Sequence, residues 1–281
     1  MTTWRELADE ASASSGLPAS EVRRLVERAS GYEGSEYYLA LEEQVSSRAG
    51  PFFLAMVERR AAGEPLQYVV GSWGFRRLDL FVDRRVLIPR PETEMVVQVA
   101  LAELSRYGRR PVVVDLGTGS GAIGLSIALE APGSTVWATD VSADALAVAE
   151  ANVTGLGTLA ARRVRLVEGP WFHALPPLMR GKVSLVVSNP PYIASDESLP
   201  DEVAEWEPSS ALRAGPTGLE DVATIVAEAP SWLSPSGGSL VVEIAPHQSA
   251  DVLSLAGDAG FAFAEIRLDL AGRERMLVAR A

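Results

Sequence analysis

The 281-residue sequence contains no cysteine, a single lysine (Lys182) and two histidines, His173 and His247. The absence of cysteine excludes a disulfide framework, a thiolate nucleophile and a thiolate-ligated zinc ion. Two histidines are too few for a histidine-based metal site, so no metal is predicted and both are expected to be structural or solvent-facing. The formal net charge is −12. So acidic a chain gains little from neutralising phosphates, which disfavours direct binding to nucleic acid.

Long apolar runs are also lacking. No stretch approaches the roughly 20 residues needed to cross a membrane, and the first residues, MTTWRELADE, lack the charged and apolar regions of a signal peptide. We therefore expect a cytoplasmic protein that does not engage membranes. Hydrophobic residues make up 47% of the chain, an ordinary share for a globular protein, and its length predicts about two domains.

Three regions follow one another along the chain. Residues 1–70 form several short amphipathic segments that end at glycines, which predicts a small helical domain. From Glu64 to Glu94 apolar and polar residues alternate between glycines and prolines. This pattern predicts one or two β-hairpins, assigned as a linker over residues 71–92. The remainder, residues 93–281, is the predicted catalytic domain.

Strand and helix patterns alternate throughout residues 93–281. This order predicts an α/β fold: a Rossmann-like, doubly wound, mostly parallel sheet of seven strands with helices on both faces. The last two predicted strands are separated only by Ala-Gly-Arg. Because three residues are too few for a crossover, that last pair must be antiparallel.

The segment VVVDLGTGSGAIG places Gly117, Gly119 and Gly121 in the turn after the first strand of this domain, and Asp140 ends the next strand. Glycines permit a tight turn and close approach of a ligand to the backbone, and the acid can accept the ribose hydroxyls. The pattern is typical of a site for an adenosine-containing cofactor. Gly119, Gly121 and Gly124 also satisfy the fingerprint of nicotinamide dinucleotides, so a dehydrogenase is an alternative.

A second motif ends another predicted strand, where VSLVVS runs into Asn189, Pro190, Pro191 and Tyr192. The Asn189 side-chain oxygen and the Pro190 carbonyl can each accept an N–H bond from a planar amino group, and Tyr192 can pack on its flat face. Both bonds strengthen as the nitrogen gains positive charge, which stabilises a transition state without a strong base. Alternatively, the prolines only terminate the strand or form a polyproline recognition segment.

Two features favour methyl transfer over hydride transfer. The glycine turn begins with Asp115, whose charge suits the ammonium end of an amino-acid cofactor better than a pyrophosphate. The Asn-Pro-Pro-Tyr motif has a task in methyl transfer and none in hydride transfer. The two motifs together therefore favour a methyltransferase.

The motifs DLGTGSG and SNPPY, with Asp140, resemble those of class I S-adenosylmethionine-dependent methyltransferases that act on planar amino groups. PLQYVVG, LIPRPETE and DLAGRER are similar to the protein-(glutamine-N5) methyltransferases of the PrmC/HemK family, over nearly the whole chain. The resemblance implies methyl transfer to the glutamine of the Gly-Gly-Gln motif in class 1 peptide chain release factors. We expect a monomer. The motif NPPY also occurs in nucleic-acid methylases, so a base amino group (adenine N6 or guanine N2) is an alternative, and a catalytically silent binding module is a third.

The resemblance implies roles for particular residues. The implied cofactor-binding residues are Asp115, Gly117, Thr118, Gly119, Ser120, Gly121, Asp140, Val141, Trp171 and Asn189. The implied catalytic residues are Asn189, Pro190 and Tyr192, and substrate binding is implied for these with Pro191, Pro89, Arg90 and Glu92. Trp171 could equally be a core aromatic. Three positions depart from the family pattern. Pro170 stands where relatives often have Asp, Thr217 stands where an acidic residue is usual, and Ala245 stands where Gly is usual.

Overall fold

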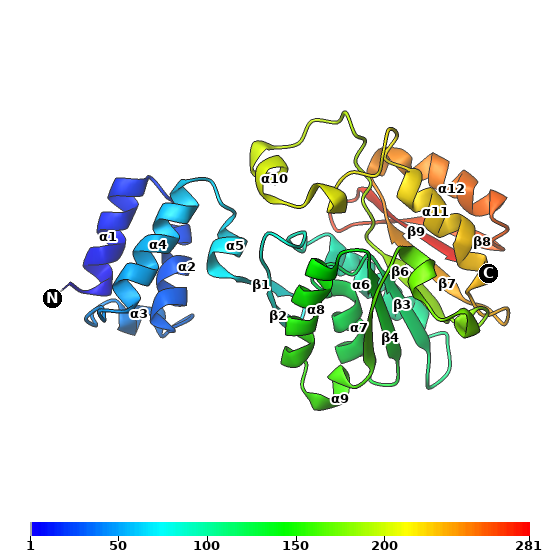
Figure 1. Ribbon diagram of the computed structural model, residues 1–281, viewed down its shortest axis with the longest axis horizontal. Coiled ribbons are helices and arrows are strands. Elements are labelled where there is room, and N and C mark those ends of the chain that lie inside the picture. The colour runs from blue at the N-terminus through cyan, green and yellow to red at the C-terminus, as the bar shows by residue number, and fades with distance from the viewer. Residues whose placement is uncertain (1) are drawn as a thin grey trace. The chain divides into compact units, whose positions relative to one another are not determined.

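The computed structural model describes residues 2–281, which divide into two units (Figure 1). One unit comprises residues 2–72 together with Pro200–Trp206, and the other comprises Trp73–Leu199 and Glu207–Ala281. The sequence analysis assigned Pro200–Trp206 to the C-terminal domain, whereas the structure groups this segment with the N-terminal helices.

The first unit is helical. Trp4 packs edge-on against Phe53, with ring centroids 5.9 Å apart, in a core that also contains Leu25, Val26 and Met56. Each helix within residues 2–72 supplies buried residues to this core, so these short helices are stabilised mainly by packing. The helices are α1 (Trp4–Ser15), α2 (Ala19–Ser30), α3 (Tyr37–Ala40), α4 (Ala49–Ala61), α5 (Leu66–Val70) and α10 (Asp201–Trp206).

The predicted hairpin is present as β1 (Ser72–Phe75) and β2 (Leu78–Phe81), and α5 lies within residues 1–70, which were predicted to be helical, although the alternation from Glu64 onwards favoured strands there. The Pro65 carbonyl accepts N–H bonds from Tyr68 and Val69, and Gly71 ends the helix with a φ of 75°. Tyr68 and Val69 are buried. Burial of two adjacent side chains suits a helical turn better than the alternating faces of a strand.

The second unit contains the predicted seven-stranded sheet, with strand order β5-β4-β3-β6-β7-β9-β8. All pairs are parallel except β7–β9 and β8–β9, which confirms the predicted fold and its antiparallel end. Leu116 of β3 pairs with Thr139 of β4 and Ser188 of β6, so these three strands end level with one another. The strands are β3 (Val112–Leu116), β4 (Thr135–Asp140), β5 (Val164–Glu168), β6 (Leu185–Ser188), β7 (Ser239–Glu243), β8 (Phe263–Leu268) and β9 (Glu274–Arg280).

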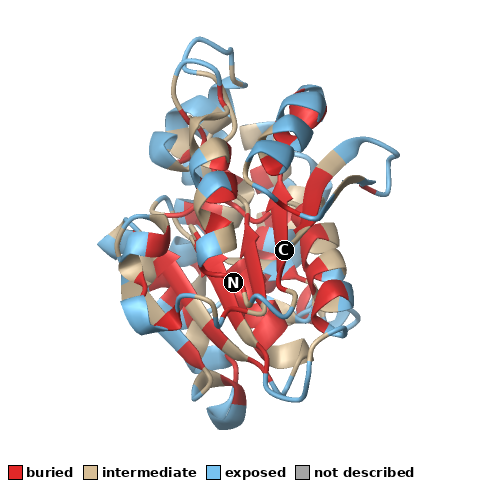
Figure 2. Ribbon diagram, turned by 90° about the vertical axis from the view of Figure 1, so that its right-hand side faces the viewer, coloured by how far each residue is buried: buried red, intermediate tan, exposed pale blue. Residues whose placement is uncertain are grey.

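Helices cover both faces of this sheet (Figure 1). Val114, Val186 and Leu240 point to the face covered by α11 and α12, where they join Ile225 and Val252 in one core cluster. The other face is covered by α6, α7 and α8, so the central strands are buried throughout (Figure 2). No helix within residues 2–281 is long and apolar enough to cross a membrane. The helices are α6 (Thr93–Leu104), α7 (Ala122–Glu130), α8 (Ala143–Gly155), α9 (Thr158–Ala161), α11 (Glu220–Glu228) and α12 (Ser249–Asp258).

Candidate active site

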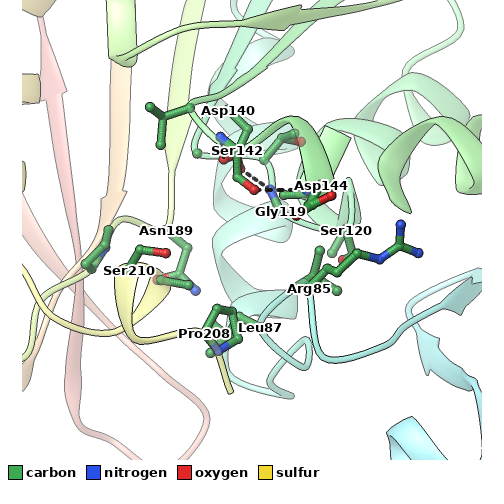
Figure 3. Close-up of a pocket in the computed structure, with 18 of the residues that line it drawn as sticks. Arg85, Leu87, Gly119, Ser120, Asp140, Ser142, Asp144, Asn189, Pro208 and Ser210 are labelled. Atoms are coloured by element: carbon green, nitrogen blue, oxygen red, sulfur yellow. Dashed lines mark hydrogen bonds between the residues drawn. The ribbon is translucent and has the colours of Figure 1, made fainter. Parts of the chain in front are cut away.

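A cavity of about 560 Å³ lies at the carboxyl ends of β3, β4 and β6 in the second unit (Figure 3). This volume is typical of a small-molecule site, and the carboxyl end of a parallel sheet is where such sites form. The cavity brings together the glycine turn and the Asn-Pro-Pro-Tyr motif, which are far apart in the sequence. Predicted site residues that line it are Pro89, Gly117, Thr118, Gly119, Ser120, Asp140, Val141, Trp171, Asn189 and Pro191.

The turn after β3 is held open by glycines in the left-handed region, with φ of 68° at Gly117 and 56° at Gly119. Asp140 ties this turn to the end of β4: its Oδ2 accepts the Gly119 N–H at 2.9 Å, and its Oδ1 accepts the Ser142 N–H at 3.0 Å. Figure 3 shows these bonds at the rim of the cavity. Burial raises the pKa of Asp140. These two hydrogen bonds and a third from the Val141 backbone lower the pKa and so oppose part of that rise. The Asp140 carboxylate is therefore fixed in place while it borders the cavity.

Asp115 lies beneath the turn and does not line the cavity. One carboxylate oxygen, Oδ2, accepts hydrogen bonds from Thr118 Oγ1 at 2.6 Å and from the Gly124 N–H at 2.9 Å. Within residues 2–281 the other oxygen, Oδ1, has no hydrogen-bond partner. Burial raises the pKa of this carboxyl to about 6. A buried acceptor without a partner is costly, so Oδ1 adds to the cost of burying this carboxyl beneath the turn.

Gly121 also lies outside the cavity lining, although it belongs to the same turn. It precedes α7 with a φ of 87°, and a Cβ there would lie 2.7 Å from Leu125. A glycine is therefore required at position 121 by the packing and the backbone conformation at the start of the helix.

Trp171 borders the cavity in a strained backbone conformation, with a φ of 43°. Its ring lies over the turn, where Cζ3 is 3.2 Å from the place a Gly117 Cβ would occupy. A side-chain hydrogen bond joins Trp171 to Asp221 in α11, whose pKa is raised by burial. Trp171 also packs against the core cluster, so both roles considered for it are present. Asp221 borders the cavity too and was not found from the sequence, because no motif marks it.

Asn189 and Pro191 line the cavity directly after β6. The preceding Ser188 donates a 2.7 Å hydrogen bond to the Leu116 carbonyl, which joins the ends of β6 and β3. The Asn189 Nδ2 donates to Thr93 Oγ1 at 3.4 Å. In Figure 3, Asn189 faces the cavity from the side opposite Ser120 and Arg85.

Pro190 and Tyr192 do not line the cavity. Pro190 is buried, and the Tyr192 hydroxyl donates to Oε1 of buried Glu243 at 3.4 Å. Burial raises the pKa of Tyr192 to about 12, so the phenol is neutral at physiological pH. Glu243 also accepts a 2.8 Å hydrogen bond from Thr93 Oγ1. The sequence analysis did not find Thr93 or Glu243.

The PRPETE segment contributes only Pro89 and Thr93 to the cavity lining. Arg90 instead pairs with Glu207, which also accepts the Ile88 N–H at 3.1 Å. Glu92 pairs with Arg273 at 2.9 Å. These two charged residues, predicted to bind substrate, hold the segment against its neighbours in this structure.

A glutamine supports the end of the Asn-Pro-Pro-Tyr motif. Gln248 Nε2 donates to the carbonyls of Tyr192 at 3.0 Å and Gly218 at 2.9 Å, and its Oε1 accepts the Ala245 N–H. This contact could not be predicted from the sequence, because Gln248 follows a different strand. His173 and His247 are both exposed, and no cluster of metal-ligating side chains occurs in the described part of the chain.

The fold and this cavity define a Rossmann-like methyltransferase. Residues 93–205 match the Methyltransferase small domain family, whose members use S-adenosylmethionine. The solved hMettl16 catalytic domain superimposes with a TM-score of 0.55, covering 90% of this chain and 86% of that one. At 15% sequence identity this likeness shows the fold alone.

Sequence relatives are more specific. Residues 5–71 match the PrmC N-terminal domain. The chain is 42% identical to the release factor glutamine methyltransferase of Burkholderia pseudomallei, over 93% of this chain and 91% of that protein. It is 38% identical to the enzyme of the same name from Deinococcus radiodurans, over 98% of both chains. The chain belongs to the release factor glutamine methyltransferase family, which excludes the dehydrogenase alternative.

Proposed function

We propose that this chain transfers a methyl group from S-adenosylmethionine to the side-chain nitrogen N5 of the glutamine in the Gly-Gly-Gln motif of class 1 peptide chain release factors. One observation carries the proposal: Asn189 lines the same cavity as Gly119 and Asp140. The amide acceptor and the cofactor turn therefore face one space, as transfer between two reactants requires. The named activity of the curated relatives supports it.

The residues present fit the cofactor. The glycine turn exposes backbone to the cavity, Asp140 offers a fixed carboxylate for ribose hydroxyls, and Trp171 offers an aromatic surface for adenine. When bound, S-adenosylmethionine supplies an electrophilic methyl group on a sulfonium ion.

The chain's own residues then orient the substrate nitrogen. The Asn189 side-chain oxygen accepts one of its N–H bonds, and this bond strengthens as the nitrogen becomes positive. No strong base is needed, because the nitrogen is positively charged directly after methyl transfer and is then acidic enough to lose a proton to water. Tyr192, held by Glu243 and Gln248, fixes the end of the motif.

The first unit is proposed to bind the body of the release factor. It exposes large apolar side chains, among them Tyr38 (62% exposed), Leu39 (70%) and Phe52 (45%), which suit a protein surface better than a nucleic acid. Binding energy from these remote contacts would help to position the glutamine. We further propose that the protein acts as a monomer in the cytoplasm, the compartment of its proposed substrate.

Label transfer tests this proposal. Purified enzyme is incubated with S-adenosylmethionine labelled in the methyl group and, in separate reactions, unmodified release factor, ribosomal RNA or double-stranded DNA. We expect label in the release factor and none above background in either nucleic acid. Label in RNA or DNA alone would assign the enzyme to base methylation.

A further inference from the structure

Besides Tyr192, a buried carboxyl behind the Asn-Pro-Pro-Tyr motif has a second hydrogen-bond partner, to which no role has been given above. Glu243 ends β7 and is 1% exposed. Its Oε2 accepts the Thr93 hydroxyl at 2.8 Å, and its Oε1 accepts the Tyr192 hydroxyl at 3.4 Å. Burying a carboxylate costs free energy unless hydrogen bonds compensate it. The hydrogen-bond partners of Glu243 therefore indicate its role.

The hydrogen-bond chain from Glu243 has a direction. A threonine hydroxyl carries one proton, so a Thr93 hydroxyl that donates to Glu243 can only accept from its other neighbour. That neighbour is the Asn189 Nδ2, at 3.4 Å. The amide of Asn189 is thereby held with its NH2 group towards Thr93 and its oxygen free to accept from a substrate.

The opposite arrangement would disable the site. A protonated Glu243 can donate to Thr93, and Thr93 could then donate to the Asn189 oxygen. The amide would turn over and present its NH2 group to the substrate NH2 group, so that two donors would face each other. The orientation of Asn189 therefore depends on the charge of a residue that does not touch the substrate.

Both charge states of Glu243 are accessible near neutral pH. Burial is the main cause that raises its pKa, to about 7, and Glu92 raises it further. Arg275 of β9 and the hydrogen bonds from Thr93 and Tyr192 lower the pKa and oppose this effect. A change of pH around 7 thus changes whether Glu243 accepts from Thr93 or donates to it, and with it the direction of the hydrogen bond between Thr93 and Asn189.

We propose that ionised Glu243 is a positioning residue, which acts through the Thr93 hydroxyl to hold the Asn189 oxygen towards the substrate amide. This inference rests on the proposed function for its catalytic consequence. The orientation of the Asn189 amide is a property of the enzyme alone and can be measured without turnover.

The same two elements supply a matched control at their other ends. Ser239, at the start of β7, donates a 2.7 Å hydrogen bond to Glu103 near the end of α6. This bond repeats the hydroxyl–carboxylate contact of Thr93 and Glu243, but the Arg280 guanidinium pairs with Glu103 at 2.7 Å. Ser239→Ala therefore removes an equivalent bond between α6 and β7 away from the cavity.

The kinetic experiment measures kcat and KM for unmodified release factor between about pH 5.5 and pH 9. The wild-type kcat/KM should rise with an apparent pKa near 7, since this parameter reports the free enzyme. Thr93→Val should lower kcat by about tenfold to a hundredfold, as is usual when an orienting group is lost, and should abolish this acid limb. Thr93→Ser should restore the limb and most of the turnover, and Ser239→Ala should keep both. Glu243→Gln should lack the limb, because its side chain does not titrate.

The second readout is the side-chain NH2 resonance of Asn189 in a proton–nitrogen NMR spectrum, assigned by its loss in Asn189→Asp. It should titrate near pH 7 in the wild type and in Ser239→Ala, but not in Thr93→Val or Glu243→Gln. A wild-type enzyme inactive on release factors would remove the proposed function, and this titration would still decide the inference. An acid limb or an Asn189 titration that persists in Thr93→Val would overturn it.

Discussion

At the scale of single residues, Asp140 illustrates how one side chain serves both the fold and the ligand. Its two carboxylate oxygens accept the N–H groups of Gly119 and Ser142, and it still borders the cavity. The turn that would bind the cofactor is therefore positioned by the same carboxylate that would bind the ribose.

Asp140→Asn and Asp140→Ala should both weaken cofactor binding. A hydrogen bond to a charged group is worth about 1.5–3 kcal/mol, which corresponds to about ten- to a hundredfold in Kd. Asp140→Ala should have the larger effect because it also frees the turn. Calorimetric titration with S-adenosylhomocysteine measures this, with Asp251→Ala, an exposed carboxylate of α12, as the control. Unchanged affinity in Asp140→Ala would mean that the cofactor lies elsewhere.

Glu243 makes a separate prediction for stability. Its pKa is raised from 4.5 to about 7 in the folded state, so the folded protein binds this proton more tightly than the unfolded chain. The resulting stabilisation is complete below about pH 4.5 and is lost as pH rises through about 7. Relative to wild type, Glu243→Gln should therefore gain free energy of unfolding between pH 5 and pH 8, by at most about 3 kcal/mol.

Urea denaturation at the two pH values measures this difference. Glu103→Gln provides the contrast, because Arg280 lowers the pKa of Glu103: the stabilisation is nearly complete above about pH 4.5, so its loss should cost nearly the same at pH 5 and at pH 8. A Glu243→Gln variant with the same pH dependence as wild type would show that this carboxyl does not titrate as described.

The cavity residues that could be predicted from the sequence are those that belong to local motifs. Gly117, Gly119 and Asn189 were all found from strand-and-turn patterns, and all three line the cavity. Thr93 and Glu243 carry no such pattern. Their contact joins the start of a helix to the end of a strand 150 positions later, and only the folded sheet brings them together.

At the scale of elements, the loop before α11 determines where the Asn-Pro-Pro-Tyr motif ends. Gly218 has a φ of 77°, and a Cβ there would lie 2.6 Å from the Tyr192 carbonyl oxygen. The same carbonyl accepts a hydrogen bond from Gln248. Two loops that follow different strands thus fix the end of the Asn-Pro-Pro-Tyr motif.

Gly218→Ala should therefore reduce turnover as well as stability. Gly272, in the turn between β8 and β9, has a φ of 78°, but a Cβ there would meet nothing within 4 Å. Both variants incur a backbone penalty of about 1–2 kcal/mol, but only Gly218→Ala displaces Tyr192. Thermal unfolding and steady-state assays should show comparable backbone losses but a fall in kcat only for Gly218→Ala. Equal kcat in the two variants would contradict the supporting role of this loop.

Element types followed well from the sequence where periodicity was long, as in the strands and helices of the sheet. The segment of α5 fitted both the helical prediction for residues 1–70 and the alternation from Glu64, because five residues between Pro65 and Gly71 show too little periodicity to distinguish a turn of helix from a strand. In the structure Val69 packs into the core of the first unit and the adjacent Tyr68 is also buried, as a helical turn allows.

At the scale of the whole molecule, the two units are not contiguous in the sequence. Arg60 of α4 forms ion pairs with Glu21 at 2.7 Å and with Glu202 at 3.1 Å. The second pair links the segment Pro200–Trp206 to the N-terminal helices of the first unit. An ion pair across 142 positions leaves no local pattern, so the sequence placed the domain boundary without it. Family membership extends over both units, since the relatives align with nearly all of the chain.

The central claim is that Asn189 and the cofactor turn act together on a glutamine side chain. Peptide mass spectrometry after incubation with S-adenosylmethionine and unmodified release factor tests it most directly. Ribosomal RNA is included in the same reaction as a competitor. We predict a single methyl group on the glutamine of the Gly-Gly-Gln motif, absent when that glutamine is replaced by glutamate. Turnover should fall at least about a hundredfold with Asn189→Ala. Methyl groups on RNA alone, or an Asn189→Ala enzyme with more than about a tenth of wild-type turnover, would contradict the account.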